Sequence, residues 1–294
     1  MGEGTCVPPR RRVRVGVKSS GSTPLGAAHA RFGNSRLITQ RKIMGKMDGM
    51  VAIVTGASRG LGRAIAKEYA QEGARVVACA RSQSPTGLSG TLEETVASIR
   101  AEGGEVLSVA CDVTDEAQVG ELVGQAVANY AQIDVLFNNA GAMVLGESLL
   151  EIDSVRWKQV VDVNVTGTYM VSRAVLPQMI RQNRGSIINV GSRMADDPKL
   201  GGGVLYSATK AAVHMFSYCL AEEVREHNVA VNILSPGSLK SEGSAAIPWT
   251  QGDWHLRVEP DVVGPSAVYL ALQDANSMTG QLLLRADFGK TWGA

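Results

Sequence analysis

The sequence predicts an α/β fold built on a single doubly wound parallel sheet of about seven strands, with helices on both faces. Short apolar runs alternate with longer segments of helical spacing from residue 47 onward, which is the pattern of successive βαβ units. The runs are apolar at consecutive positions, as expected for strands buried on both faces. Because crossovers between parallel strands are right-handed, the Rossmann-type arrangement is the leading topology.

The individual elements follow from this pattern. Strands are expected at residues 50–55, 75–80, 106–111, 133–137, 186–190, 229–234 and 281–284. Helices are expected at residues 63–71, 91–101, 116–130, 155–182, 204–227 and 261–272. Thr91 and Glu94 have the spacing of a capping box at the start of one helix. Residues 82–90 are expected to form a long loop.

Residues 1–46 differ in composition from the rest of the chain. They hold ten Lys or Arg and a single acidic residue, Glu3, whereas the remainder holds 19 basic and 27 acidic residues. This composition is that of an organellar transit peptide. A disordered extension, or an upstream start codon assigned in error before Met44 or Met47, is favoured. We expect residues 47–294 to form one catalytic domain, in the cytoplasm or, with a transit peptide, in the mitochondrial matrix or another organelle.

Several classes of partner are not expected. The net charge of +1 does not indicate a nucleic-acid-binding protein, although the basic N-terminus keeps that alternative open. No apolar run approaches the roughly 18 residues of a spanning helix, so no membrane partner is expected. The four cysteines, Cys6, Cys79, Cys111 and Cys219, form no metal-binding pattern, and we expect no metal.

A glycine-rich turn follows the first expected strand. Gly56, Gly60 and Gly62 lie between that strand and the first helix. A diphosphate at a helix N-terminus needs free backbone N–H groups and no Cβ in the way, so these glycines predict a dinucleotide site. The other turn residues expected to contact the cofactor are Thr55, Ser58, Arg59 and Leu61.

Charge near this turn favours NADP(H) over NAD(H). A site for NAD usually places a carboxylate about 20 residues beyond the glycines, where it binds the ribose 2′-hydroxyl. Here that stretch reads Ala80-Arg81-Ser82. A carboxylate would repel a 2′-phosphate, whereas a guanidinium binds it. We therefore expect Arg81 and Ser82, together with Arg59, to hold the 2′-phosphate.

Tyr206, Lys210 and Ser192 predict proton-transfer chemistry. Tyr206 and Lys210 are four residues apart on an expected helix, so they share a face. An ammonium about 5 Å away would favour the phenolate by roughly 3 kcal/mol and lower the pKa by about two units. Tyr206 would then act as general acid in reduction and general base in oxidation. Ser192 follows the strand at 186–190 and could donate to the substrate oxygen.

These motifs, in this order, resemble the classical short-chain dehydrogenase/reductase family over nearly all of residues 47–290. The family's motifs also include the residues Asp112, Val113, Asn139, Ala140, Gly141, Asn164, Pro236 and Gly237, with Ser241 as a milder match. The resemblance implies that Asp112 and Val113 contact the adenine, and that Pro236, Gly237 and Ser241 lie on the nicotinamide side. It implies a water on Asn164 that links Lys210 to solvent, and contact of Lys210 with ribose hydroxyls.

The resemblance implies an NADP(H)-dependent carbonyl reductase or alcohol dehydrogenase that forms a homodimer or homotetramer through the helices at 155–182 and 204–227. A 3-oxoacyl-thioester reductase is one specific alternative, and a non-catalytic dinucleotide-binding sensor or scaffold is another. The chain departs from the family at the long loop 82–90 and at Ala286-Asp287-Phe288-Gly289, where the family often has Asp-Gly-Gly.

The substrate side is less defined by the sequence. Residues 239–258 hold Trp249 and Trp254, and are expected either to form a mobile lid or to pack on a neighbouring subunit. Met194 and Trp249 are expected to contact a small carbonyl or alcohol substrate together with Ser192 and Tyr206. His214, on the same expected helix as Tyr206, is interpreted as a core or interface residue.

Overall fold

Seven parallel strands form one sheet in the order β3-β2-β1-β4-β5-β6-β7, which confirms the predicted architecture. The computed structural model describes residues 45–81, 89–201 and 203–293, without the side chains of Pro248 and Trp249. The strands are β1 Val51–Thr55, β2 Arg75–Ala80, β3 Val106–Ala110, β4 Val135–Asn138, β5 Gly185–Val190, β6 Val229–Ser235 and β7 Leu282–Leu284. Each overlaps its predicted range.

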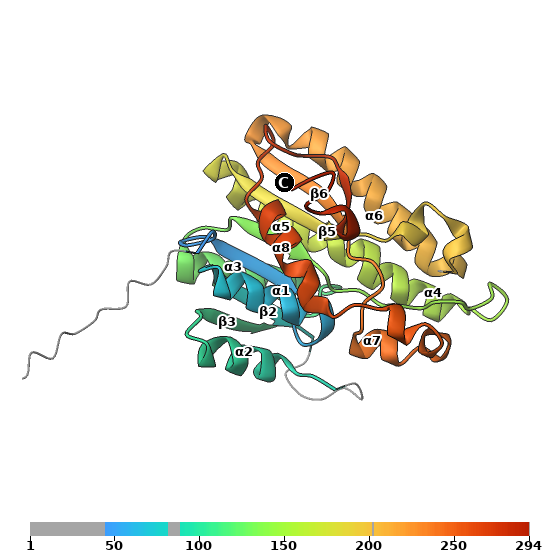
Figure 1. The fold of residues 1–294 in the computed structure, drawn as a ribbon. Helices are drawn as coiled ribbons and strands as arrows, with labels where there is room; N and C mark the ends of the chain where they lie inside the picture. The colour runs from blue at the N-terminus through green and yellow to red at the C-terminus, as the bar shows by residue number, and fades with distance from the viewer. Residues whose placement is uncertain (1–44, 82–88, 202, 294) are drawn as a thin grey trace, which may run out of the picture. The chain divides into compact units, whose positions relative to one another are not determined.

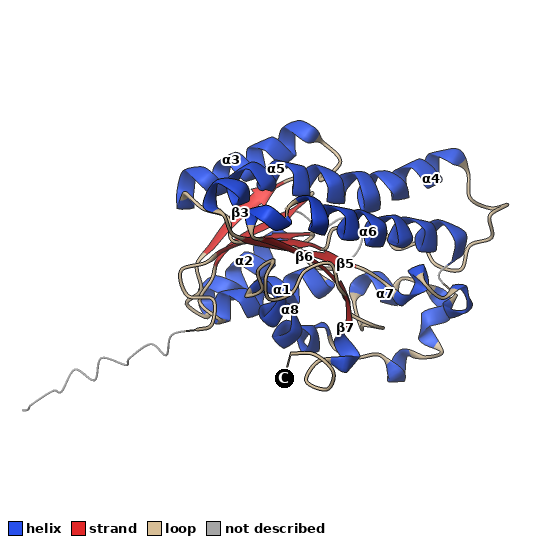
Figure 2. Ribbon diagram, turned by 90° about the horizontal axis from the view of Figure 1, so that it is seen from above, coloured by secondary structure: helices blue, strands red, loops and turns tan. Residues whose placement is uncertain are grey.

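Two layers of helices cover the sheet (Figures 1 and 2). The helices are α1 Gly60–Gln71, α2 Leu92–Ala101, α3 Glu116–Tyr130, α4 Ser154–Val161, α5 Gly167–Gln182, α6 Gly203–Glu223, α7 Glu242–Ala245 and α8 Gly264–Ala271. Figure 2 shows α3, α5 and α6 over one face of the sheet and α1, α2 and α8 under the other. The capping box of Thr91 and Glu94 is present at the start of α2.

Alternation along the strands divides the apolar side chains between two cores. In β1, Ala52 and Val54 pack with α1 and α8, whereas Val51 and Ile53 pack with α3 and α5. All four are fully buried, because successive side chains of a strand point to opposite faces. The parallel sheet is therefore buried on both sides, as its continuous apolar runs indicate.

Three predicted helices differ from the structure. The single helix expected at 155–182 is interrupted by a π-helical turn, Asp162–Thr166, between α4 and α5. The helix expected to end at residue 227 ends at Glu223 and is followed by a 3₁₀ turn, Arg225–His227. The helix expected from residue 261 begins at Gly264, after the 3₁₀ turn Pro260–Val263. Local spacing does not distinguish these tighter or wider turns from an α-helix.

Some predictions fall where the structure gives no description. Residues 1–44 and 82–88 lie outside the described residues, so the proposals for the N-terminal segment, for Ser82 and for most of its loop stay predictions. In the described part of the chain, no helix is long and apolar enough to cross a membrane. The same part holds no cluster of His, Cys, Asp or Glu suited to a metal ion.

A buried carboxylate joins the amino ends of β1 and β4. Asp134 is 4% exposed, and its Oδ2 accepts hydrogen bonds from the Val51 backbone N–H (2.8 Å) and from Gln132 Nε2 (2.7 Å). Its Oδ1 lies 2.7 Å from the Arg184 guanidinium. This carboxylate lies at the edge of the sheet opposite to the glycine turn, so it should affect stability without affecting the chemistry of the site.

We predict that Asp134→Ala lowers the free energy of unfolding by about 2–4 kcal/mol, because it leaves the buried Val51 N–H without an acceptor. Denaturant unfolding measures the loss. Asp134→Asn keeps one acceptor oxygen and should cost less than half as much. If the two variants lose the same free energy of unfolding, the hydrogen bond from Val51 does not dominate the contribution of Asp134 to stability.

Candidate functional site

The glycine turn and the other candidate residues gather at the carboxyl edge of the sheet. In the observed strand order β1 lies between β2 and β4, so chain connections leave β1 and β4 in opposite directions. Ligands of doubly wound sheets bind at such a switch point. The glycine turn follows β1, Gly191 and Ser192 follow β5, and Pro236 follows β6.

The glycines of the turn are required by backbone geometry. Gly56 and Gly60 have φ angles of +66° and +51°, a region that side chains other than glycine rarely adopt. A Cβ on Gly62 would lie 2.2 Å from the Gly56 carbonyl oxygen, so α1 could not pack against the turn. These three residues therefore hold the N-terminus of α1 close to β1.

Thr55 and Asn139 brace the turn against the end of β4. Thr55 Oγ1 accepts hydrogen bonds from the Asn139 and Ala140 backbone N–H groups, both at 3.0 Å. Asn139 Nδ2 donates in return to the carbonyl oxygens of Thr55 (3.0 Å) and Gly56 (3.2 Å). The side chains of these two predicted cofactor residues thus shape the floor of the site.

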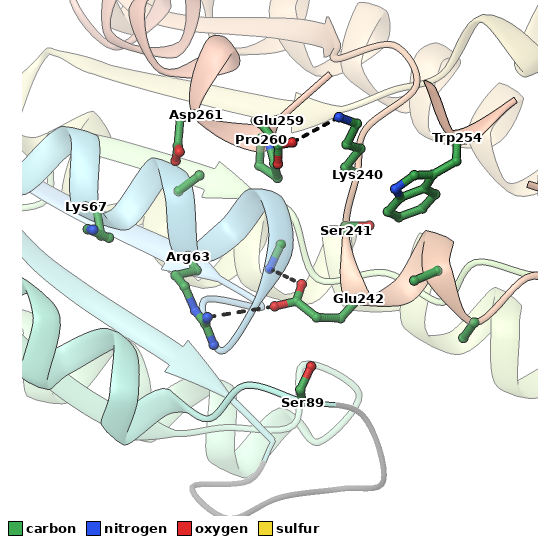
Figure 3. Close-up of a pocket in the computed structure, with 14 residues that line it drawn as sticks. Arg63, Lys67, Ser89, Lys240, Ser241, Glu242, Trp254, Glu259, Pro260 and Asp261 are labelled. Atoms are coloured by element: carbon green, nitrogen blue, oxygen red, sulfur yellow. Dashed lines mark hydrogen bonds and ion pairs between the residues drawn. The ribbon is translucent and has the colours of Figure 1, made fainter. Parts of the chain in front are cut away.

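A carboxylate of the chain itself caps the N-terminus of α1. The Gly60 backbone N–H donates to Glu242 Oε2 at 2.9 Å, and Arg63 Nη1 lies 3.7 Å from Glu242 Oε1 (Figure 3). The positive end of a helix dipole favours an anion at this place. Glu242 was not predicted as a site residue, since it is 182 positions from Gly60 and no local pattern relates the two.

A cavity of about 870 Å³ adjoins this contact. It lies between the exposed side of α1 and the segment 240–261 (Figure 3). Its lining mixes the basic residues Arg63, Lys67 and Lys240 with the acidic residues Glu242, Glu259 and Asp261. Trp254 lines it too, whereas Ser192 and Tyr206 do not. The cavity is therefore next to the glycine turn and separate from the tyrosine.

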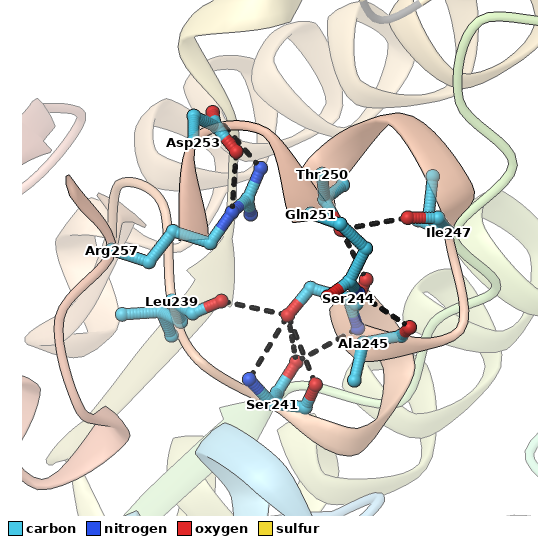
Figure 4. Close-up of polar contacts among 9 residues, drawn as sticks. All are labelled: Leu239, Ser241, Ser244, Ala245, Ile247, Thr250, Gln251, Asp253 and Arg257. Atoms are coloured by element: carbon cyan, nitrogen blue, oxygen red, sulfur yellow. Dashed lines mark hydrogen bonds and ion pairs between the residues drawn. The ribbon is translucent and has the colours of Figure 1, made fainter. Parts of the chain in front are cut away.

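The segment expected to cover the substrate folds as a loop closed at its base. Leu239 and Val258 form an isolated bridge, and the Lys240 N–H donates to the Val258 carbonyl at 2.8 Å. Inside the loop, Ser244 Oγ donates to the Leu239 carbonyl and Thr250 Oγ1 donates to the Ser244 carbonyl, both at 2.7 Å (Figure 4). This network indicates a loop that holds its own shape.

Two residues of this loop were predicted to contact the cofactor or the substrate. Ser241, expected on the nicotinamide side, forms a capping box with Ser244 at the start of α7. Its hydroxyl lies 2.9 Å from Ser244 Oγ, so in this structure it organises the loop. The side chain of Trp249 lies outside the described part of the chain, and its contact with substrate stays a prediction.

Tyr206, Lys210 and Ser192 come together beside β5. Tyr206 and Lys210 lie one turn apart on α6, and Lys210 Nζ is 5.7 Å from the centre of the Tyr206 ring. Lys210 is buried, and its Nζ donates to the Val190 carbonyl at 2.8 Å. The Ser192 hydroxyl lies close enough to the Tyr206 phenol to lower the pKa of the phenol by hydrogen bonding. The structure thus brings the three side chains into one site.

The expected lowering of the Tyr206 pKa is wrong. Desolvation raises the pKa of Tyr206 to about 12, and the contact with Ser192 offsets only part of this rise. Burial also lowers the pKa of Lys210 to about 8. Because both groups lose water, the cost of forming a phenolate here exceeds the benefit of a nearby ammonium.

Asn164 is buried in the π-helical turn and ties two segments together. Its Oδ1 accepts from the Ala142 N–H at 2.7 Å, and its Nδ2 donates to the Ala142 carbonyl (3.0 Å) and to Thr209 Oγ1 (3.1 Å). Thr209 precedes Lys210 on α6. The side chain of Asn164 therefore fixes the loop after β4 to the tyrosine helix, and the predicted water stays a prediction.

The remaining predicted residues lie around this edge with varied partners. Arg81 is exposed directly after β2, and Ser58 accepts a hydrogen bond from Arg63 through its carbonyl (2.7 Å). Asp112 Oδ1 accepts from the Thr114 N–H and hydroxyl at 2.9 and 2.8 Å. Val113 was expected to contact the adenine. In the structure its side chain is buried in the core on the side of α3 and α5.

Four more lie close to the tyrosine site or the end of β6. Gly141 lies beside Asn164, because a Cβ there would be 3.3 Å from Asn164 Oδ1. The Met194 N–H donates to Ser192 Oγ at 3.2 Å. The Pro236 carbonyl accepts from Arg285 Nε at 3.3 Å, and Gly237 has a φ of +81°.

Comparison with known proteins agrees with this geometry. A family model described as short chain dehydrogenase matches residues 50–251. An uncharacterized oxidoreductase of Methylorubrum extorquens is 34% identical over 250 residues, which are 82% of this chain and 97% of the relative. The 3-oxoacyl-acyl-carrier-protein reductase FabG of Thermotoga maritima is 32% identical over 247 residues, 81% of this chain and 96% of the relative.

Solved structures show the same likeness. A metagenomic short-chain oxidoreductase in complex with NADP has a TM-score of 0.69 and 33% identity, and the match covers 82% of this chain and 98% of that one. The family model and the relatives extend over most of the described sheet and its helices. The chain is therefore an oxidoreductase of the short-chain dehydrogenase family.

Proposed function

We propose that the protein is an NADP(H)-dependent carbonyl reductase, or alcohol dehydrogenase in the reverse direction, and that Tyr206 is its proton donor. The observation that carries the proposal is the meeting of Tyr206, Ser192 and Lys210 at the carboxyl edge of the sheet. Lys210 is buried there on the helix next to the end of β5. Two polar groups beside one phenol suit an oxygen that gains negative charge during reaction.

The protonation states of Tyr206 and Lys210 support reaction in the direction of carbonyl reduction. A phenol with a pKa of about 12 is protonated throughout the neutral range and can donate to the carbonyl oxygen of a substrate. The Ser192 hydroxyl would donate a second hydrogen bond to the same oxygen. Lys210, with a pKa of about 8, is mostly an ammonium at pH 7. Its positive charge would stabilise the negative charge on the phenol oxygen after the proton has left.

The residues of the glycine turn fit a dinucleotide with a diphosphate. The Gly60 N–H already donates to a carboxylate oxygen of Glu242, which stands in for a phosphate oxygen at the N-terminus of α1. We propose that Arg59 and Arg81 bind the 2′-phosphate. No carboxylate lies next to either arginine in the sequence, so no negative charge there would repel the phosphate. When bound, the cofactor supplies the hydride. Lys210 and the segments after β3, β4 and β6 would hold its adenosine, ribose and nicotinamide groups.

One specific substrate class is favoured by a relative. The similarity to a 3-oxoacyl-acyl-carrier-protein reductase supports a 3-oxoacyl thioester as one candidate substrate. Met194, whose N–H donates to Ser192 Oγ, is partly exposed and is free to contact such a substrate. If the protein reduces no carbonyl, we expect it to be a sensor that binds the dinucleotide without turnover.

We further propose a homodimer or homotetramer formed through α4, α5 and α6. These helices expose large apolar side chains, with Val155 63% exposed, Met215 61% and Tyr169 44%. Exposed apolar residues on neighbouring helices are typical of protein interfaces.

A first experiment measures oxidation of NADPH and NADH against a panel of ketones, aldehydes and 3-oxoacyl thioesters. We expect turnover with NADPH in preference to NADH, and a loss of at least about 100-fold in kcat for Tyr206→Phe, which lacks the donated proton. Tyr218→Phe, on the same helix, serves as the matched control and should leave turnover unchanged. Full activity of Tyr206→Phe would exclude the proposed proton donor.

Glu242 generates a second prediction, because its carboxylate occupies the place proposed for the diphosphate. Two anions cannot share the Gly60 N–H without repulsion, so Glu242 must withdraw from α1 when the cofactor binds. The loop has its own hydrogen bonds and could move as a unit about its base at Leu239 and Val258.

We therefore expect Glu242→Gln to bind NADPH about tenfold more tightly than the natural protein, measured by titration of cofactor fluorescence. Binding of 2′-AMP, which carries no diphosphate, should not change. Asp253→Asn, in the same loop, is the control and should bind as the natural protein does. Weaker binding by Glu242→Gln would mean that the carboxylate assists the cofactor instead of competing with it.

A further inference from the structure

His214 continues the face of α6 that carries the proposed catalytic groups. It lies one turn beyond Lys210 and two turns beyond Tyr206, and it is 3% exposed. A buried histidine needs partners for both ring nitrogens, because an unsatisfied polar atom in the interior is costly. Its partners therefore show what the residue does in the fold.

One ring nitrogen holds the backbone of Ser192. The Ser192 N–H donates to His214 Nε2 at 3.3 Å. Gly191 allows this approach, since a Cβ there would lie 2.6 Å from Nε2 and 2.4 Å from the Ile233 side chain. The imidazole thus fixes the residue at which the chain turns from β5 into the 3₁₀ turn Arg193–Ala195.

The other ring nitrogen faces the far end of the same turn. Among the described residues His214 Nδ1 has no hydrogen bond of good geometry, and the nearest carboxylate oxygen is Asp196 Oδ1 at 3.4 Å. A backbone N–H can only donate, so Nε2 must keep its lone pair. In the neutral ring the proton is then on Nδ1, pointing toward Asp196. His214 consequently spans the turn from Ser192 to Asp196.

We infer that His214 is a positioning residue, which holds Ser192 against Tyr206 while its ring is neutral and releases Ser192 when the ring gains a second proton. The inference rests on the proposed function, because it gives Ser192 a role toward the substrate oxygen. A protonated Nε2 is a donor and would face the Ser192 N–H, also a donor. Protonation of Nε2 therefore removes the acceptor of the Ser192 N–H and also makes the contact between the two groups repulsive.

Three charged or titratable groups surround this ring. Burial lowers the pKa of His214 below its usual value of 6.5, Asp196 opposes this shift, and Lys210 adds to it. Burial raises the pKa of Tyr218, on the same helix, and the nearby Asp196 adds to this rise. The strand β6 contributes the apolar Ile233. His214 is therefore neutral at pH 7, and its contribution to stability and to Ser192 is lost as pH falls below 6.5.

The first test is the pH profile of kcat for carbonyl reduction between about pH 5 and pH 8. We expect the natural protein to lose activity at the acid end. His214→Gln places a carbonyl oxygen within similar reach and does not titrate. Its activity at low pH should therefore stay near its activity at pH 8, so the acid limb of the profile, which is the loss of activity at low pH, should disappear. His214→Leu removes the acceptor and should lower kcat roughly tenfold at every pH, with little change in KM for NADPH.

Two further variants separate this role from general effects on the fold. Asp196→Asn removes the charge that favours the protonated ring, so the acid limb should move to lower pH while activity at pH 8 stays unchanged. His227→Gln replaces the partly exposed histidine of the turn after α6 and should leave the profile as it is.

A second readout does not depend on turnover. In protein carrying isotope-labelled serine and histidine, the Ser192 amide resonance, assigned by its loss in Ser192→Ala, should titrate with the same midpoint as the His214 ring. In His214→Gln it should not titrate. Independent titration of the two groups, or an unchanged acid limb in His214→Gln, would overturn the inference. Linked titration without turnover of any carbonyl would instead support the contact and contradict the proposed function.

Discussion

Removal of water from the Tyr206 phenol and the Lys210 ammonium is the physical constraint on which the chemistry of this protein depends. Desolvation favours the neutral form of each group, so it raises the pKa of the tyrosine to about 12 and lowers that of the lysine to about 8. The phenol consequently stays protonated at neutral pH, as the proposed proton donor must. The lysine keeps its charge at neutral pH while its ammonium is held by the Val190 carbonyl.

Buried polar contacts beneath the site hold these groups in place. Asn138 Nδ2 donates to Asn189 Oδ1 (2.9 Å) and to Ser172 Oγ (3.0 Å), and Asn189 Nδ2 donates to Ser217 Oγ (2.8 Å). This chain of bonds joins β4 and β5 to α5 and α6. Because each member has a partner, the network favours one packing of the tyrosine helix on the sheet.

The sequence predicts what local pattern determines, and fails where distant segments meet. Apolar runs that alternate with helical segments were sufficient to predict the seven strands and their parallel direction. The i, i+4 spacing was sufficient to place Tyr206 and Lys210 on one face. The contact of Glu242 with Gly60 joins residues 182 positions apart. The pKa of Tyr206 was predicted in the wrong direction because pairwise charge can be estimated from spacing, whereas burial cannot.

In the proposed reaction, a hydride from the cofactor and a proton from Tyr206 reach one carbonyl group. Transfer of deuterium from NADPH labelled at the nicotinamide C4, in each of its two stereochemical forms, tests it most directly. We predict that one form gives an alcohol with a single deuterium on the former carbonyl carbon, detected by mass spectrometry and NMR. An alcohol without deuterium from either form, or no alcohol from any carbonyl, would contradict the account.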